Sequence, residues 1–193
     1  MIKKIVLNLI FLSPLVYMLY GLQSAVDPIK YIYIHTGSTA IVMLILTLCI
    51  TPLRKVKNLV KYRRFVGLYT FFYAFLHFIN FFVLDAELSV AFVIKQTLDK
   101  PFVYLGMISF VVLLFMSITS TRKLFKKYRT WHNGVYLVLG IITIHASMAQ
   151  KVLSAVEYFY IFMAVILIGH RAFKSKWISR FFANFLQKRV KTA

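Results

Sequence analysis

The stretch TWHNGVYLVLGIITIHAS, residues 130–147, places two histidines in a run of side chains that otherwise suits a lipid environment. It belongs to one of six apolar runs, each long enough to cross the hydrocarbon core of a bilayer, because a spanning helix needs about 17–25 residues. The six runs cover residues 5–21, 34–52, 65–84, 102–119, 131–149 and 156–172. We therefore expect an all-α integral membrane protein with six transmembrane helices in a bundle.

The composition also indicates a membrane protein. Of the 193 residues, 61% are hydrophobic, against about 45–50% in ordinary soluble domains, and the mean hydropathy is +0.77. Once six spans are assigned, the rest of the chain is too short for a separate soluble domain. We expect one six-span domain over residues 1–175, a basic amphipathic tail over 176–193, and one surface helix within the long loop at 85–101.

The charges are distributed unevenly along the chain. A soluble protein with a net charge of +19 would be expected to bind nucleic acid. Here all but four of the 24 basic residues lie at the N-terminus, in the loops after the second and fourth runs, or after the sixth run. These segments share one side of a six-span bundle, and the positive-inside rule makes that side cytoplasmic. Both termini are then cytoplasmic, the basic residues face lipid head groups, and no nucleic-acid partner is expected.

Two histidines of different runs are expected at one depth in the bilayer. His77 lies 12 residues, about 18 Å, beyond Phe65, and His145 lies 14 residues, about 21 Å, beyond Trp131, with both runs directed outward. An ionisable side chain in a span is costly and by default marks a function. One imidazole from each of two helices at one level is what a six-coordinate haem needs. His77 and His145 are therefore candidate ligands of a haem iron; the alternative is that each hydrogen-bonds a neighbouring helix.

The other three histidines do not form such a pair. His132 lies 13 residues, about 20 Å, before His145, and on an ideal helix the two rings point about 140° apart. It is a candidate for a second haem or for an interfacial polar position, but arginines stand at the matching end of the third run, at positions 63 and 64. His35 and His170 each lie close to the end of a run.

Six short motifs follow one another along the chain. They are HTG at 35–37, TPLR at 51–54, RRFVGLYTFFYAFLH at 63–77, KPFVYLG at 100–106, TSTR at 119–122, and WHNGVY at 131–136 with IH at 144–145. In order and spacing they resemble the haem-binding membrane subunits of the bacterial protein-methionine-sulfoxide reductase system, a branch of the ferric-reductase-like transmembrane group. The resemblance covers nearly all six runs. The wider group has two histidines in the third span, and this chain lacks the first of them.

The resemblance implies a function, cofactors and partners. A b-type haem would be held through its iron by His77 and His145, while His132 would ligate another haem or serve electron input, and FMN would be associated with the chain. Electrons would pass from a cytoplasmic flavin reductase or a quinol to a periplasmic molybdopterin-containing methionine sulfoxide reductase, for repair of oxidised envelope proteins. The chain would be an electron-transfer subunit in the bacterial inner membrane, and the catalytic reduction would take place in the partner.

Arginines near the cytoplasmic ends of the spans are candidates for binding anionic groups. Arg63, Arg64 and Arg122 lie at the level of haem propionates, a flavin phosphate or a docked donor, although a solvated basic loop has the same pattern. The sequence contains no HExxH, Walker or GxGxxG motif, so no dinucleotide-binding domain is expected in this chain.

Two other functions remain open from the sequence. One is a stand-alone b-type ferric or quinone reductase, which would reduce its substrate without a molybdenum partner. The other is a small transporter that uses histidines as proton relays. No Asp or Glu lies in the middle of an apolar run, which argues against the transporter.

Overall fold

The regular structure of the described residues is entirely helical. The computed structural model of the protein describes residues 2–53 and 59–174; the predicted tail at 176–193 and the basic residues at 54, 55 and 57 lie outside them. The elements are α1 Ile2–Leu22, α2 Pro28–Leu53, η1 Val60–Tyr62, α3 Arg63–Asn80, η2 Phe81–Asp85, α4 Val90–Asp99, α5 Pro101–Ile118, α6 Arg122–Tyr128, η3 Trp131–Gly134, α7 Val135–Met148 and α8 Ala155–Phe173. The predicted all-α class is confirmed.

Five helical segments of the described chain are long and apolar enough to cross a membrane: Ile5–Leu22, Pro28–Leu53, Val60–Asp85, Pro101–Ile118 and Ala155–Phe173. They correspond to the first four predicted runs and the sixth. The run at 131–149 differs, because it is divided into the 3-10 helix η3 and the 14-residue helix α7. Asn133 and Gly134, at the division, have low helix propensity, which accounts for the change of winding.

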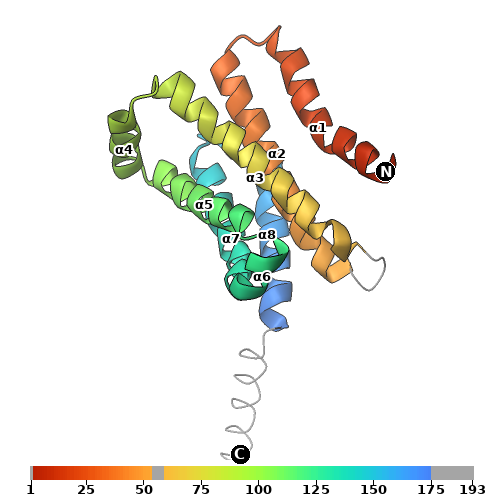
Figure 1. The fold of residues 1–193 in the computed structure, drawn as a ribbon. Coiled ribbons are helices and arrows are strands. Elements are labelled where there is room, and N and C mark those ends of the chain that lie inside the picture. The colour runs from red at the N-terminus through yellow and green to blue at the C-terminus, as the bar shows by residue number, and fades with distance from the viewer. Residues whose placement is uncertain (1, 54–58, 175–193) are drawn as a thin grey trace, which may run out of the picture.

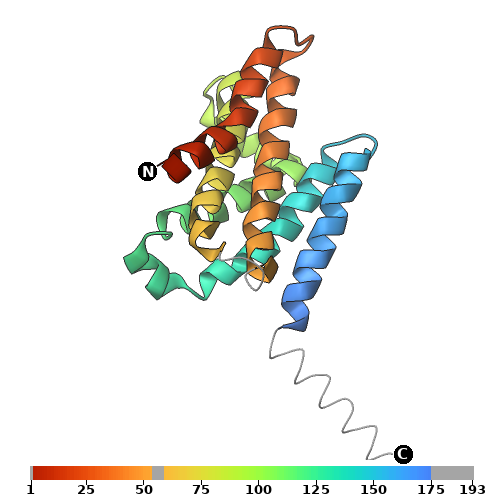
Figure 2. The same ribbon diagram turned by 90° about the vertical axis from the view of Figure 1, so that its right-hand side faces the viewer.

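The helices form a bundle in which α7 is enclosed by longer helices. α2 packs along α3, α5 along α7, and α8 against α7 (Figure 1, Figure 2). Val135, Val138 and Leu139 of α7 are buried at the spacing of one helix face. They join a core to which the other helices contribute Leu44 and Leu48 of α2, Leu113 of α5 and Leu167 of α8. Burial on several sides explains how a short helix holds a fixed place in the bundle.

α1 lies at the edge of the bundle and is joined to α3 by aromatic contacts. The ring of Phe11 lies 5.4 Å from that of Tyr69 between centroids, and the hydroxyl of Tyr73 donates a 2.7 Å hydrogen bond to the Phe11 carbonyl. Pro14 has no amide hydrogen, so it cannot bond the Ile10 carbonyl one turn earlier. The Ser13 hydroxyl donates to that carbonyl instead, at 2.8 Å.

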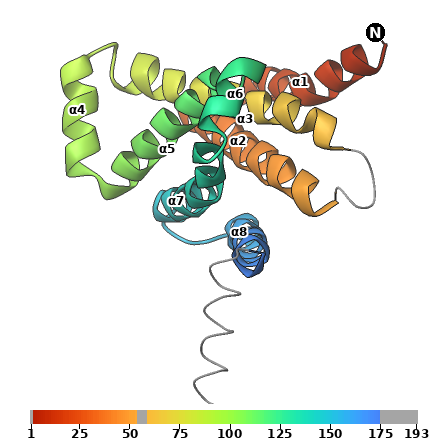
Figure 3. The same cartoon turned by 60° about the horizontal axis from the view of Figure 1, so that its bottom comes forward.

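The two ends of the bundle differ in charge. Because the helices alternate in direction (Figure 1), one end carries the acidic residues, and we call it the acidic end: Asp27, Asp85, Glu87, Asp99 and Glu157. The opposite, basic end carries the start of α3, all of α6 and the end of α8. At the acidic end α4 lies across the ends of α3 and α5 (Figure 3). The helix predicted within 85–101 is therefore confirmed, and none of its residues is buried.

Candidate functional site

His77 and His145 meet near the acidic end of the bundle. His77 lies in the last turn of α3 and His145 in the last turn of α7. Their ring centroids are 6.3 Å apart, and the ring planes are at 90° to each other. The two histidines therefore lie at one level of the folded bundle, as expected from the residue counts.

Each imidazole is tied to a neighbouring helix through its Nδ1 atom. His145 Nδ1 lies 2.6 Å from the carbonyl oxygen of Phe102 in α5, and His77 Nδ1 lies 3.2 Å from Thr36 Oγ1 in α2. A carbonyl oxygen only accepts hydrogen bonds, so His145 must be the donor. Within residues 2–53 and 59–174, Nε2 of neither ring has a hydrogen-bond partner. Metal-binding histidines have this arrangement: one ring N–H is donated to the protein and the other nitrogen faces the metal.

A glycine of the neighbouring helix lies against each ring. A Cβ atom on Gly37 of α2 would come within 3.0 Å of His77 Cε1, and a Cβ on Gly106 of α5 would come within 2.8 Å of His145 Cε1. Both distances are shorter than an ordinary van der Waals contact, so a side chain at either position would displace the imidazole. The missing Cβ atoms therefore make the space that the two rings occupy.

The geometry of the pair fits a haem iron. Two metal–imidazole bonds of about 2 Å place the ring centres about 6 Å apart, and the observed separation is 6.3 Å. In the described chain no group of three or more His, Cys, Asp or Glu side chains could hold a metal ion. A structural or catalytic zinc site needs at least three such ligands, whereas haem needs only axial ligands from the protein. The buried Ser109 hydroxyl, one turn beyond Gly106 in α5, lacks a partner among the described residues.

Tyr33 connects the histidine pair to the acidic end. Its ring lies edge-on to His77, with 5.2 Å between centroids, and its hydroxyl donates a 2.6 Å hydrogen bond to Asp85. Asp85 is exposed. One aromatic side chain therefore separates His77 from the surface of this end of the protein.

His132 has a different environment, at the basic end. Its Nε2 lies 3.0 Å from the Thr119 hydroxyl at the end of α5, and the ring of Phe125 in α6 lies 4.9 Å away. Because His132 lies in the 3-10 helix η3, the 140° estimate for an ideal α-helix does not apply, and both His132 and His145 contact α5, at its opposite ends.

The predicted arginines lie far from the histidine pair. Arg63 begins α3, 14 residues and therefore about 21 Å along the helix before His77. Arg64 follows it, Arg122 begins α6, and both side chains are exposed. All three are thus at the basic end, which also holds His132, and not near the pair.

The two remaining histidines also stay outside the pair. The ring of His35 lies 4.2 Å from Tyr31 and 5.7 Å from Tyr17 between centroids. His170 is half-buried in the last turn of α8. The structure therefore brings only His77 and His145 together.

Three residues beside the pair were not assigned a role from the sequence: Thr36, Gly37 and Gly106. The sequence does mark these positions, because all three residues belong to the motifs HTG and KPFVYLG. A motif does not show which neighbouring side chain its residues contact, so the hydrogen bond and the close approaches appear only in the folded chain.

Comparison with known proteins gives the family. Residues 36–143 match the family described as "Ferric reductase like transmembrane component". The chain belongs to the ferric-reductase-like transmembrane family. It is 34% identical over 179 residues to the protein-methionine-sulfoxide reductase heme-binding subunit MsrQ of Salmonella arizonae, covering 87% of this chain and 90% of that one. It is 33% identical over 187 residues to the MsrQ of Salmonella paratyphi B, covering 90% and 94% of the two chains. No solved structure matches the chain.

The matched region of this ferric-reductase-like chain contains most of the candidate site. Residues 36–143 include Thr36, His77 and Gly106 as well as His132. His145 lies two residues beyond the match. The site therefore lies almost wholly in the part of the chain that defines the family.

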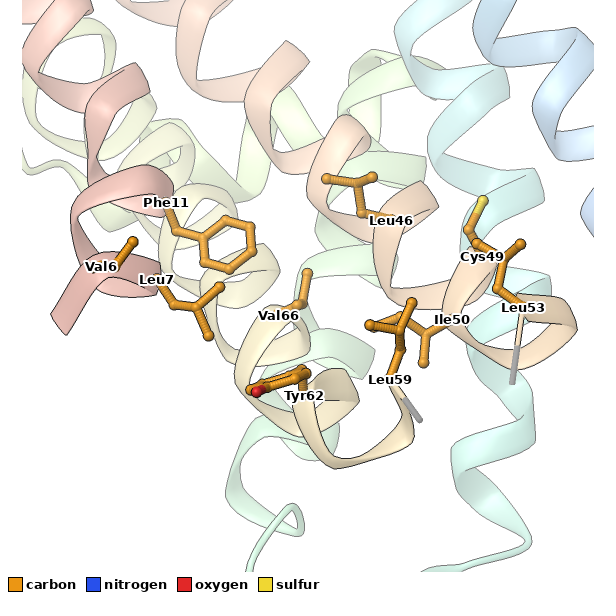
Figure 4. A pocket seen from close by; sticks show the side chains of 10 residues that line it. All are labelled: Val6, Leu7, Phe11, Leu46, Cys49, Ile50, Leu53, Leu59, Tyr62 and Val66. Atoms are coloured by element: carbon orange, nitrogen blue, oxygen red, sulfur yellow. The ribbon is translucent and has the colours of Figure 1, made fainter. Parts of the chain in front are cut away.

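A cavity of about 500 Å³ lies elsewhere in this ferric-reductase-like bundle, between α1, α2 and the start of α3 (Figure 4). It is lined by Val6, Leu7, Phe11, Leu46, Cys49, Ile50, Leu53, Leu59, Tyr62 and Val66. The lining has no histidine and no acidic or basic side chain. Such an apolar surface suits hydrocarbon chains.

Proposed function

We propose that the chain is a haem-containing transmembrane electron-transfer subunit. It carries electrons from a cytoplasmic flavin reductase or a quinol to a periplasmic molybdopterin-containing methionine sulfoxide reductase, and so serves the repair of oxidised envelope proteins. The observation that carries this proposal is the close approach of His77 and His145, whose ring centroids lie 6.3 Å apart, with Nδ1 of each ring bound to the protein and Nε2 without a partner among the described residues. The relatives named as heme-binding subunits of protein-methionine-sulfoxide reductase support the choice of cofactor and partner.

His77 and His145 hold the iron of a b-type haem in this proposal. When bound, the haem takes up and releases one electron as its iron changes oxidation state. The protein keeps both imidazoles in one orientation in either state, because Thr36 and the Phe102 carbonyl hold Nδ1. The apolar helices around the pair exclude water, which together with the ligands sets the potential of the iron.

The proposed topology has six spans with both termini in the cytoplasm of a bacterium. α7 and η3 together cover 131–148, or about 29 Å at the rises of α- and 3-10 helices, close to the roughly 30 Å of a bilayer core. The charge difference between the two ends supports this orientation, with the basic end inside. The chain then lies in the inner membrane, and the histidine pair is in its outer half.

The basic end receives the electron donor in this proposal. Arg63, Arg64 and Arg122 offer guanidinium groups to a phosphate such as that of FMN, or to an acidic surface of a flavin reductase. His132 belongs to this input region. It is not proposed as a haem ligand, because its Nε2 is bound to Thr119 and no second histidine faces it within the described residues.

We expect His132→Ala to leave the haem content per chain unchanged and to slow reduction of the haem by the cytoplasmic donor. The reason is that His132 is separated from the pair by the length of α7. Haem is measured as the pyridine haemochrome and reduction by stopped-flow absorbance. Thr119→Val, which removes the hydrogen-bond partner of His132, is the companion variant. A halved haem content in His132→Ala would instead assign a second haem to His132.

The proposed function is tested with the purified full-length chain in proteoliposomes. The expected result is a low-spin b-type spectrum that is reduced by NADH and a flavin reductase at the basic face. Reoxidation by methionine sulfoxide should require the molybdenum partner at the opposite face. Reoxidation by a ferric chelate or a quinone without that partner would favour the stand-alone reductase. Absence of a Soret band after expression with ample haem would overturn both redox functions.

A further inference from the structure

We propose that Thr36 is a positioning residue that fixes the tautomer of His77 and thereby sets the reduction potential of the haem. The proposal rests on the proposed function, since it assumes that His77 binds the haem iron. Thr36, a side chain of α2, would thus have a role in addition to that of the two ligands.

The hydrogen bonds of Thr36 determine the direction of its bond to His77. The Thr36 hydroxyl lies 2.6 Å from the Ile32 carbonyl one turn earlier in α2 and 3.2 Å from His77 Nδ1. A carbonyl only accepts, and a hydroxyl has a single hydrogen, so that hydrogen goes to Ile32. Toward His77 the hydroxyl oxygen can then only accept. His77 therefore carries its hydrogen on Nδ1 and keeps the lone pair of Nε2 for the iron.

The two histidines are held by bonds of different kinds. His145 donates to a main-chain carbonyl, that of Phe102, at 2.6 Å, and no side-chain substitution at Phe102 removes that oxygen. His77 donates to a side chain at 3.2 Å. The bond made by Thr36 can be changed by changing a residue type, whereas the backbone partners of the two ligands, Phe102 for His145 and Tyr33 for His77, cannot. Thr36 is therefore the position at which the sequence can adjust the pair.

Burial makes the Thr36 bond hard to replace. Thr36 is 1% exposed, so water does not reach the site easily when the hydroxyl is removed, and His77 keeps only the backbone of Tyr33 as a hydrogen-bond partner. Gly37 lies against the ring of His77, so the imidazole remains confined on that side. Loss of the hydroxyl should thus change the electronic state of the ligand more than its position.

The effect on the haem has a definite sign. A hydrogen bond accepted from Nδ1 increases the basicity of the imidazole, and a more basic ligand favours the ferric state, which has the higher charge. Removing the acceptor should therefore raise the reduction potential. We expect about a tenfold change in the ratio of reduced to oxidised haem at a fixed potential, which for one electron is about 59 mV.

The experiment compares Thr36→Val, Thr36→Ala and Thr36→Ser in the full-length protein. Val keeps the shape without the hydroxyl, Ala lacks both hydroxyl and methyl, and Ser keeps the hydroxyl. Thr47→Val is the matched control, because Thr47 is also buried in α2 and donates to the carbonyl one turn earlier, that of Met43 at 2.8 Å. The midpoint potential is measured by spectroscopic redox titration.

The expected result is a raised potential in Thr36→Val and Thr36→Ala, and the unchanged wild-type value in Thr36→Ser and Thr47→Val. If Val and Ala lose the haem while Ser retains it, the hydroxyl is needed to hold the ligand in position and not to adjust the potential, and the proposal is overturned. Equal potentials in all three Thr36 variants with haem bound would overturn it. A full bis-histidine spectrum in His77→Ala would overturn the proposed function instead, so the two failures are distinguishable.

Discussion

Replacing His77 or His145 with alanine is expected to lower the haem bound per purified chain by at least about tenfold. Loss of a residue that merely supports a ligand reduces metal affinity by about 10–100-fold, so loss of a ligand should cost at least as much. The ring centroids lie 6.3 Å apart, and the described chain has no third histidine beside them that could take over. Haem per chain is measured as the pyridine haemochrome against protein concentration.

His35→Ala and His170→Ala are the matched controls for these variants. Both replace a half-buried histidine of a long helix, and we expect both proteins to retain the wild-type haem content. If His77→Ala and His145→Ala each retained the full low-spin signal, the iron would be held elsewhere. His132 and His170 would then become the candidate ligands.

The histidine pair could be predicted from the sequence because depth in a membrane depends on residue counts. A helix rises by a constant amount per residue, so counting from the ends of two apolar runs places His77 and His145 at one level. The rotation of α2 about its own axis cannot be obtained by counting. It is set by packing against α3, and it decides that Thr36 and Gly37 face His77. The sequence therefore predicts that His77 and His145 lie at one level, but it does not predict that Thr36 and Gly37 contact His77.

The start of the fifth run shows a second limit of sequence reasoning. The sequence places residues 131–149 in one apolar run, because the run is delimited by charged residues and its first four residues carry none of them. These residues, WHNG, form the 3-10 helix η3, and α7 begins only at Val135. The Thr119 hydroxyl at the end of α5 binds His132 within this segment. Local propensity and a tertiary hydrogen bond together thus determine the winding that the apolar pattern did not reveal.

Replacing Gly106 with valine is expected to reduce the haem content about as strongly as replacing His145. A Cβ at this position would lie 2.8 Å from His145 Cε1 and 3.0 Å from Nδ1. The ring cannot move away freely, because Nδ1 is bound to the Phe102 carbonyl on the same helix as Gly106. Overpacking of this kind costs about 1–3 kcal/mol, and each 1.4 kcal/mol is a factor of about ten in affinity. Gly106→Ala, with one added carbon, should show a smaller loss.

Gly169→Val is the matched control for Gly106→Val. Gly169 also lies inside a long helix, α8, but a Cβ there would meet no atom within 4 Å. Both variants carry the same change in helix propensity, so a difference between them reports the space beside His145. Haem per chain and the circular dichroism of the purified proteins are the two measurements. We expect Gly106→Val to keep its helical signal and lose haem, and Gly169→Val to keep both. Full haem content in Gly106→Val would show that the His145 ring does not need this space to bind the iron.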